Sequence, residues 1–149
     1  MISADTNIFV YAVDDRDPLG RQPVAQAVVL RLTALQHPIA LQVVGELQNV
    51  LRRRLKLPPH LAMQQARNIF ATFPNFTYDA GCVEIALGQA AAGRYSYWDA
   101  LLLTACSRAG ITTLLSEDMR DGSVFLGVQI VNPFSPQGLS PRASKLLQL

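Results

Sequence analysis

The sequence has little charge, few cysteines and no long run of apolar residues. Only 16% of its 149 residues are charged, against about 25% in an average globular protein, while 50% are hydrophobic. This balance excludes intrinsic disorder for most of the chain, and the length fits one domain. Charged residues, Gln or Gly interrupt every apolar run before the roughly 18 residues that a membrane-spanning helix needs. We therefore expect a single folded domain that does not cross a membrane.

The cysteine count and the N-terminus indicate where the protein works. Cys82 and Cys106 form no CxxC pair and are too few for a disulfide framework. No basic segment precedes the first apolar stretch, and Asp5 interrupts that stretch at once, so a signal peptide is not expected. These features favour a reducing cytoplasm as the location.

Several site motifs are absent as well. Neither GxGxxG nor GxxxxGK[ST] occurs, which excludes the usual dinucleotide and P-loop phosphate sites. No GxSxG occurs, and the only two histidines, His37 and His60, each lie beside a proline without Cys/His spacing, so zinc is disfavoured. The net charge of +2 is too small to indicate nucleic-acid binding by itself.

Apolar periodicity predicts short strands that alternate with helices. Strands are expected over 1–4, 39–41, 111–115 and 127–131, and helices over 21–35, 42–56, 60–73, 79–92 and 97–108. Residues 8–11 fit either a helix or a further strand, and Asp79 and Ser96 are the expected N-caps of two helices. This order favours an α/β domain with a mainly parallel sheet covered on both faces, which binds ligands beyond the carboxyl ends of its strands.

Four acids interrupt apolar sequence at places that such a sheet would bring together. Asp5 ends the first strand, Glu46 lies one turn into a helix, Asp99 lies in the first turn of another helix, and Asp118 follows the penultimate strand. The first three have no cation within four residues. Carboxylates that face one another repel and are costly to bury, and a divalent cation removes both problems. Oxygen ligands of this kind favour Mg²⁺ or Mn²⁺.

Each acid also has an ordinary structural explanation. Asp5 can cap the helix that follows it, and Asp99 is favoured by the dipole of its own helix. Glu46 fits a solvated helix position, and Glu117 with Asp118 fits a polar turn. The pattern alone leaves both interpretations open.

Aromatic and basic residues give two weaker indications. Tyr97 and Trp98 fit core packing within a helix, with stacking on nucleic-acid bases as the alternative. The basic run Arg52–Arg54 fits a solvated helix end, with phosphate binding as the alternative.

Four segments together resemble a known family. They are Ser3-Ala4-Asp5-Thr6-Asn7-Ile8, Val44-Gly45-Glu46-Leu47, Ser96-Tyr97-Trp98-Asp99-Ala100-Leu101 and Leu115-Ser116-Glu117-Asp118-Met119. In order and spacing they resemble the PIN-domain ribonucleases, and most closely the VapC-type toxins of bacterial toxin–antitoxin pairs. The likeness covers residues 1–134, which leaves 135–149 as a C-terminal tail that is either a short docking helix or frayed.

The resemblance implies a three-layer α/β/α PIN-like domain with a short, mainly parallel central sheet, and RNA cleavage that depends on Mg²⁺ or Mn²⁺. By position, Asp5, Glu46 and Asp99 match the core acids of the family, and the fourth acid is either Asp118 or Asp121. Thr6 and Ser116 match hydroxyl positions, and Asn7 matches a residue that orients the site. Many relatives carry a further acid shortly after the position of Asp99, and because residues 100–103 supply none, one bound metal is an alternative to two.

The implied partners are an RNA substrate, a cognate antitoxin and a second copy of the chain. Arg52–Arg54 and Arg94 are the candidates for a basic rim that attracts RNA. A catalytically silent PIN-like module that binds RNA or protein is the main alternative. A phospho-aspartate protein is a weaker one, because neither lysine, Lys56 or Lys145, follows a strand.

Overall fold

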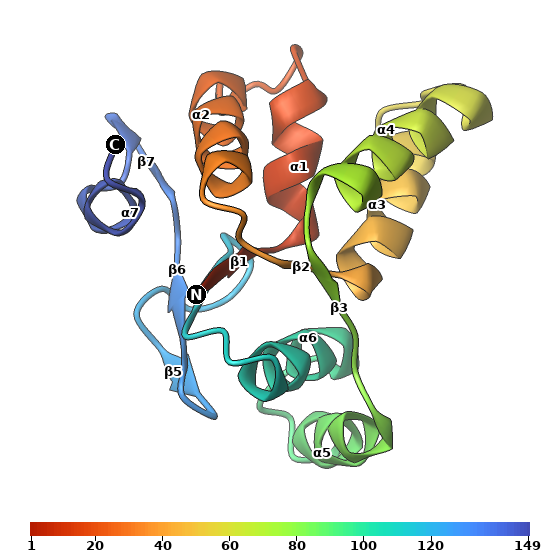
Figure 1. Ribbon diagram of the computed structural model, residues 1–149, viewed down its shortest axis with the longest axis vertical. Helices are drawn as coiled ribbons and strands as arrows, with labels where there is room; N and C mark the ends of the chain where they lie inside the picture. Colours follow the sequence, from red (N-terminus) through yellow and green to blue (C-terminus); the bar gives the residue numbers. More distant parts are fainter.

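A computed structural model of residues 1–149 shows three layers (Figure 1). Helices α1 (Thr6–Val13) and α2 (Gln22–Ala34) cover one face of the central sheet, and α5 (Ala80–Ala91) and α6 (Tyr97–Arg108) lie on the other side. Residues 8–11, which fit either helix or strand in the sequence, belong to α1. The expected three-layer α/β/α architecture is confirmed.

The central sheet has the order β1-β4-β6-β5. Strands β1 (Ile2–Ala4), β4 (Thr113–Leu115) and β6 (Val128–Val131) run parallel, and β5 (Val124–Phe125) adds an antiparallel edge. Every residue of β1 and β4 is buried, as expected for strands covered on both faces. The sheet is therefore short and mainly parallel.

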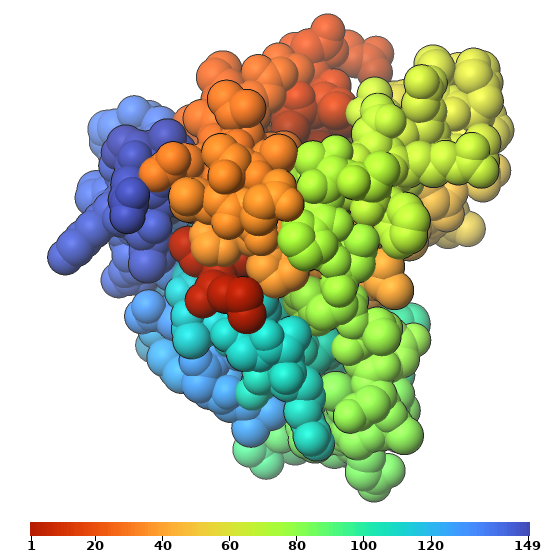
Figure 2. Space-filling model, in the orientation of Figure 1, coloured from red at the N-terminus to blue at the C-terminus, as the bar shows by residue number.

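A helical hairpin projects from one side of these layers. It consists of α3 (Leu41–Arg53) and α4 (Pro59–Thr72), and in Figures 1 and 2 it stands out from the rest of the molecule. A two-stranded parallel ribbon, β2 (Ile39–Ala40) with β3 (Asn75–Phe76), ties both ends of the hairpin to the domain. This ribbon fixes the start of α3 beside the sheet.

Residues after β6 form a small hairpin and a last helix. Strand β7 (Phe134–Ser135) pairs with β8 (Gly138–Leu139), and α7 (Pro141–Leu147) follows. The hydroxyl of Ser140 accepts a hydrogen bond from the backbone N–H of Ala143 and caps α7. Ala143 and Leu147 are buried in the main hydrophobic core, so this short helix is docked by its apolar side.

Helix α6 has a long buried segment. All residues from Ala100 to Cys106 are buried, which matches a helix placed between a sheet and another helix. Ser96 caps it through a hydrogen bond from the N–H of Asp99, and Asp79 caps α5 in the same way through the N–H of Cys82. Both caps are as the sequence predicts. No helix combines the length and the apolar character needed to cross a membrane.

Candidate active site

The parallel register brings residues from two distant segments to one edge of the sheet. Ala4 of β1 pairs with Leu115 of β4, so Asp5 and Ser116 leave neighbouring strands at the same level. The N–H of Asp5 donates to the carbonyl of Leu115 at 2.9 Å, and the hydroxyl of Ser116 donates to Oδ2 of Asp5, also at 2.9 Å. Sheet pairing thus fixes the position of the Asp5 carboxylate.

Asp5 also begins helix α1. Its Oδ1 accepts a hydrogen bond of 2.6 Å from the N–H of Thr6, so Asp5 caps this helix, as one of the two explanations from the sequence expects. Its carboxyl group is buried, with 8% of the residue exposed. Burial raises its pKa to about 6, and the charges of Asp118 and Glu46 add to the rise, while the hydrogen bonds from Ser116 and Thr6 oppose it. A positive charge would relieve this carboxylate.

One face of α3 supplies the second wall of the site. Gln42, Glu46 and Asn49 are spaced four and three residues apart and therefore lie on the same side of the helix. Oε2 of Glu46 accepts a hydrogen bond of 2.8 Å from the hydroxyl of Thr6, and its Oε1 accepts one of 2.8 Å from Gln42. Both oxygens of Glu46 are thus held toward α1 and the pocket.

The first turn of α6 and the loop after β4 supply the remaining acids. Asp99 lies in the first turn of α6, where the cap at Ser96 fixes the backbone. Asp118 accepts a hydrogen bond of 2.7 Å from the side-chain amide of Asn7. Burial raises the pKa of Asp118, and the charges of Glu117 and Asp99 raise it further. The acids therefore repel one another across a shared space.

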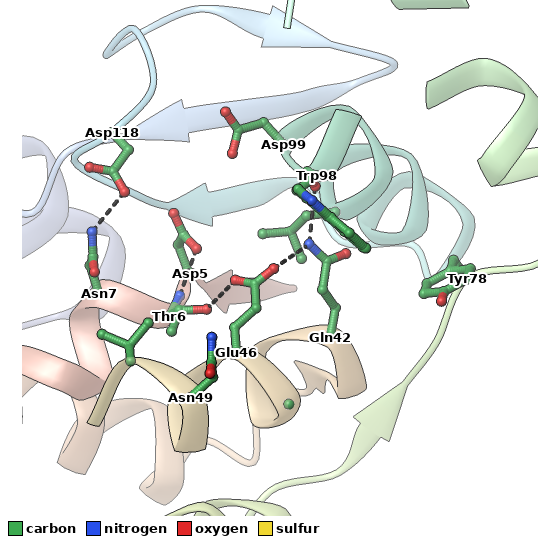
Figure 3. A pocket seen from close by; sticks show the side chains of 13 residues that line it. Asp5, Thr6, Asn7, Gln42, Glu46, Asn49, Tyr78, Trp98, Asp99 and Asp118 are labelled. Carbon is green, nitrogen blue, oxygen red and sulfur yellow. Dashed lines mark hydrogen bonds between the residues drawn. The ribbon is translucent and has the colours of Figure 1, made fainter. Parts of the chain in front are cut away.

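This space is a pocket of about 630 Å³. Its lining includes all four acids, together with Thr6 and Asn7, and Figure 3 shows the carboxylates of Asp5, Glu46, Asp99 and Asp118 around it. No three carboxylate, thiol or imidazole groups are grouped closely enough to hold a metal ion as they stand. The pocket thus collects carboxylate oxygens. Those of Asp5, Glu46 and Asp118 accept hydrogen bonds within the protein, whereas the Asp99 carboxylate accepts none.

The structure separates the two candidates for the fourth acid. Asp118 lines the pocket, whereas Asp121 accepts a hydrogen bond from the N–H of Asn132 and forms an exposed ion pair with Arg142 at 3.2 Å. Asp121 therefore fastens the loop after β4 to the start of the C-terminal segment. Ser116 contributes through its hydrogen bond to Asp5.

Several residues of the pocket were not singled out as ligands or site residues from the sequence. Gln42 and Asn49 belong to this group, and their i, i+7 spacing around Glu46 is the signal that identifies them. The interpretation of Trp98 as a core residue is wrong, because 58% of it is exposed and it lines the pocket. It sits at the start of α6, where the helix extends past its buried segment. Arg52–Arg54 do not line the pocket.

A partly buried polar cluster supports the loop that carries Asp118. The guanidinium of Arg21 binds Asp17 through two nitrogens, at 2.6 and 2.9 Å, and binds Glu117 at 2.7 Å. It also lies 3.7 Å from the ring centroid of Tyr11, whose hydroxyl donates to the other oxygen of Glu117. The residue next to Asp118 is thus held by donors from α1 and from the start of α2.

Comparison with solved structures identifies the architecture. The crystal structure of Mycobacterium tuberculosis VapC20, described as a sarcin-ricin loop cleaving toxin, superposes with a TM-score of 0.59 at 22% sequence identity. The match covers 76% of this chain and 87% of that chain. The chain has a PIN-like fold. At this identity the likeness concerns the fold alone. No protein-family model matches the sequence, and no curated protein matches it either.

Proposed function

We propose that this protein is a metal-dependent endoribonuclease that hydrolyses RNA phosphodiester bonds. The observation that supports it most is the pocket at the carboxyl edge of the sheet, which Asp5, Glu46, Asp99 and Asp118 all line. Four carboxylates lining one pocket, one of them buried with its pKa raised to about 6, are costly without a cation. The fold that this chain shares with VapC20, which is described as a sarcin-ricin loop cleaving toxin, supports the same assignment.

Mg²⁺ or Mn²⁺ is the ion that this donor set would hold, because the ligands are hard oxygens and no Cys or His lines the pocket. Asp5, Asp99 and Asp118 are the proposed ligands, with Glu46 completing the set directly or through water. Since no three of these groups are already clustered, binding requires their side chains to turn toward one another. When bound, the cation would supply the positive charge that neutralises the scissile phosphate and favours ionisation of the attacking water.

The chain's own groups would position substrate and water. Ser116 and Thr6 keep the Asp5 carboxylate oriented, and Thr6 also holds Glu46. Glu46, which lines the same pocket, would accept a proton from the attacking water where it does not bind the cation directly. Asn7 holds Asp118 through its amide.

Substitution of Asp5 by Asn tests this proposal against a matched control. Asp5→Asn keeps the size of the side chain but removes a negative charge, so we expect RNA cleavage in Mg²⁺ or Mn²⁺ to fall to the background rate. Asp121→Asn makes the same change outside the pocket and should retain cleavage. A chelator should abolish cleavage by the parent protein, and added Mg²⁺ should raise the melting temperature of the parent more than that of Asp5→Asn.

Two results would reject the assignment. Cleavage by Asp5→Asn at the parent rate would show that Asp5 takes no part in the reaction. RNA binding without cleavage, in either metal, would favour the alternative of a catalytically silent PIN-like module that binds RNA or protein.

We also propose that the protein is the toxin of a type II toxin–antitoxin pair, bound by a cognate antitoxin and forming a homodimer. The shared fold with VapC20 supports the toxin role. Met63 and Phe70, which lie seven residues apart on α4 and therefore on the same side of it, expose 46% and 50% of their surface, and this supports association through the projecting hairpin. Expression of the parent chain in a bacterial host should arrest growth, and expression of Asp5→Asn should not.

A further inference from the structure

His37 lies outside the pocket and joins two segments that are distant in the sequence. It follows the end of α2 and precedes Pro38 and β2. Its Nδ1 accepts a hydrogen bond of 3.4 Å from the backbone N–H of Ile2, the first residue of β1 (Figure 1). One imidazole thus connects the start of the N-terminal strand to the link between α2 and β2.

The end of α2 fixes the backbone that carries this imidazole. Gln36 adopts a left-handed conformation with φ +53, and the N–H groups of Gln36 and His37 donate to the carbonyls of Thr33 and Leu32, each at 3.0 Å. This pair of bonds is the Schellman arrangement that ends many helices. Pro38 restricts the backbone on the other side. The imidazole is therefore held beside Ile2 by restraints that do not depend on its own charge.

Ile2 needs an acceptor because β1 is an edge strand. In the central sheet β1 pairs with β4 alone. The carbonyl of Met1 and the N–H of Asp5 bond to residues 112–115 on that side, each at 2.9 Å. Backbone groups of alternate residues point to opposite edges of a strand, so the N–H of Ile2 points to the unpaired edge. Ile2 is only 8% exposed, and His37 supplies the acceptor that a further strand would otherwise provide.

The charges that act on the imidazole are all positive. They are the amino terminus, which donates to the hydroxyl of Thr112 at 3.5 Å, and the guanidinium of Arg31 on α2. Residues 18–45, which include α2, the turn at His37, β2 and the start of α3, contain no Asp or Glu. The carbonyl end of α2 is the one feature that favours a positive charge here, and such an effect is weak near the surface. No carboxylate is thus placed to stabilise a protonated His37.

We propose that His37 is an acid-sensitive switch that fastens the start of β1 only while its imidazole is neutral. In the neutral ring Nδ1 accepts the bond from Ile2, and the proton is on Nε2. Protonation adds a hydrogen to Nδ1, so two donors face each other and the bond is lost. The new charge also faces the amino terminus and Arg31. Acid therefore releases the start of β1, the short strand that leads directly to Asp5. The switch goes beyond the proposed ribonuclease function and does not depend on it.

The direction of the pH effect follows from linkage. The pKa of His37 lies below the ordinary value of 6.5, and burial is the largest cause. The unfolded chain therefore takes up this proton at a higher pH than the folded chain. Stability falls as the pH drops below 6.5 and levels off once the folded imidazole is also protonated. Asp5 acts in the opposite direction, because its pKa is raised to about 6. The informative quantity is the difference between the parent and a His37 variant at each pH.

His37→Asn tests the switch in the full-length protein. The Oδ1 of Asn can take the place of Nδ1 and accept the bond from Ile2, but Asn does not titrate. Between about pH 7.5 and about pH 5 we expect the melting temperature of the parent, followed by circular dichroism, to fall by about 2–4 °C relative to that of His37→Asn. His60→Asn is the matched control, because His60 is the only other histidine and is exposed on α4. Its difference from the parent should stay constant over this range.

NMR of the parent protein tests the hydrogen bond itself, whatever the stability of the variant. The amide signal of Ile2 should shift with pH at the same midpoint as the ring protons of His37, and this shift should be absent in His37→Asn. An Ile2 amide that does not respond to the titration of His37 would refute the switch. So would a melting temperature whose pH dependence is the same in the parent and His37→Asn. Cleavage rates are unsuitable as the measurement, because Asp5 ionises in the same pH range.

Discussion

Replacement of Arg21 by Met should destabilise the fold in a pH-dependent way. Met keeps an apolar side chain beside the Tyr11 ring but removes the guanidinium that binds Asp17 and Glu117. The Asp17 side chain is 2% exposed and that of Glu117 17%, so both carboxylates lose their partner in a largely buried place. Breaking a buried pair from one side costs about 3–5 kcal/mol and an exposed pair about 0–1 kcal/mol. For this half-sheltered cluster we expect a loss of about 2–4 kcal/mol at pH 7.

The pH dependence follows from the lowered pKa of Asp17. The hydrogen bonds from Arg21 hold that pKa at about 2, below the ordinary value of 3.8. A carboxyl group with a lowered pKa in the folded state stabilises the protein above its unfolded pKa and loses that contribution as the pH falls through the folded pKa. The stability gap between the parent and Arg21→Met should therefore be widest above about pH 4 and should narrow as the pH falls toward 2.

Urea unfolding followed by circular dichroism at a series of pH values measures this gap. Arg31→Met is the matched control, because Arg31 donates to two neutral acceptors, the carbonyl of Leu147 at 2.6 Å and the side chain of Gln148 at 3.1 Å. Its stability loss should stay constant between pH 4 and pH 2. A gap for Arg21→Met that is equally constant, or smaller than about 1 kcal/mol at pH 7, would refute the assigned role of the cluster.

Two further substitutions test the site and the core. Ser116→Ala removes the hydroxyl that donates to Asp5 and should lower the rate of RNA cleavage about tenfold or more, whereas Ser107→Ala, whose hydroxyl binds the carbonyl of Leu126, should leave the rate unchanged. Leu114→Ala in the fully buried strand β4 should lower the free energy of unfolding by about 2–5 kcal/mol. Leu30→Ala changes a residue that is 72% exposed and should alter the free energy of unfolding by no more than about 0.5 kcal/mol. Urea titrations measure both variants, and equal losses of stability would contradict the assigned core.

The layers of the fold were predictable because their signals are local. Helix periodicity and the capping residues Asp79 and Ser96 identify α5 and α6 from short stretches of sequence. The antiparallel edge strand β5 and the β7–β8 hairpin were not predicted, since strands of two residues carry no periodicity and depend on pairing with partners already in place.

The acids of the site were predictable for a different reason. A charged residue within an apolar stretch is easily recognised in a sequence, and Asp5, Glu46 and Asp99 are residues of this kind. The cluster around Arg21 gave no such signal, because Glu117 lies 96 residues away from it and only the folded chain brings the two together. The exposure of Trp98 was equally hidden, since it is apolar like the buried residues that follow it and is exposed only because it lies in the first turn of α6.

Asp5 connects the stability of the fold with the proposed chemistry. Its carboxylate caps α1 and accepts a hydrogen bond from the strand-end residue Ser116, yet burial still raises its pKa to about 6. Because an acid with a raised pKa destabilises the folded state once it ionises, Asp5 costs the metal-free protein roughly 3 kcal/mol at neutral pH. The two hydrogen bonds to the Asp5 carboxylate do not offset the cost of burying its charge. If Asp5 served only as a helix cap, an uncharged Ser or Asn would cap α1 without that cost. A negative charge kept at this cost fits a group whose partner is a cation that arrives after folding.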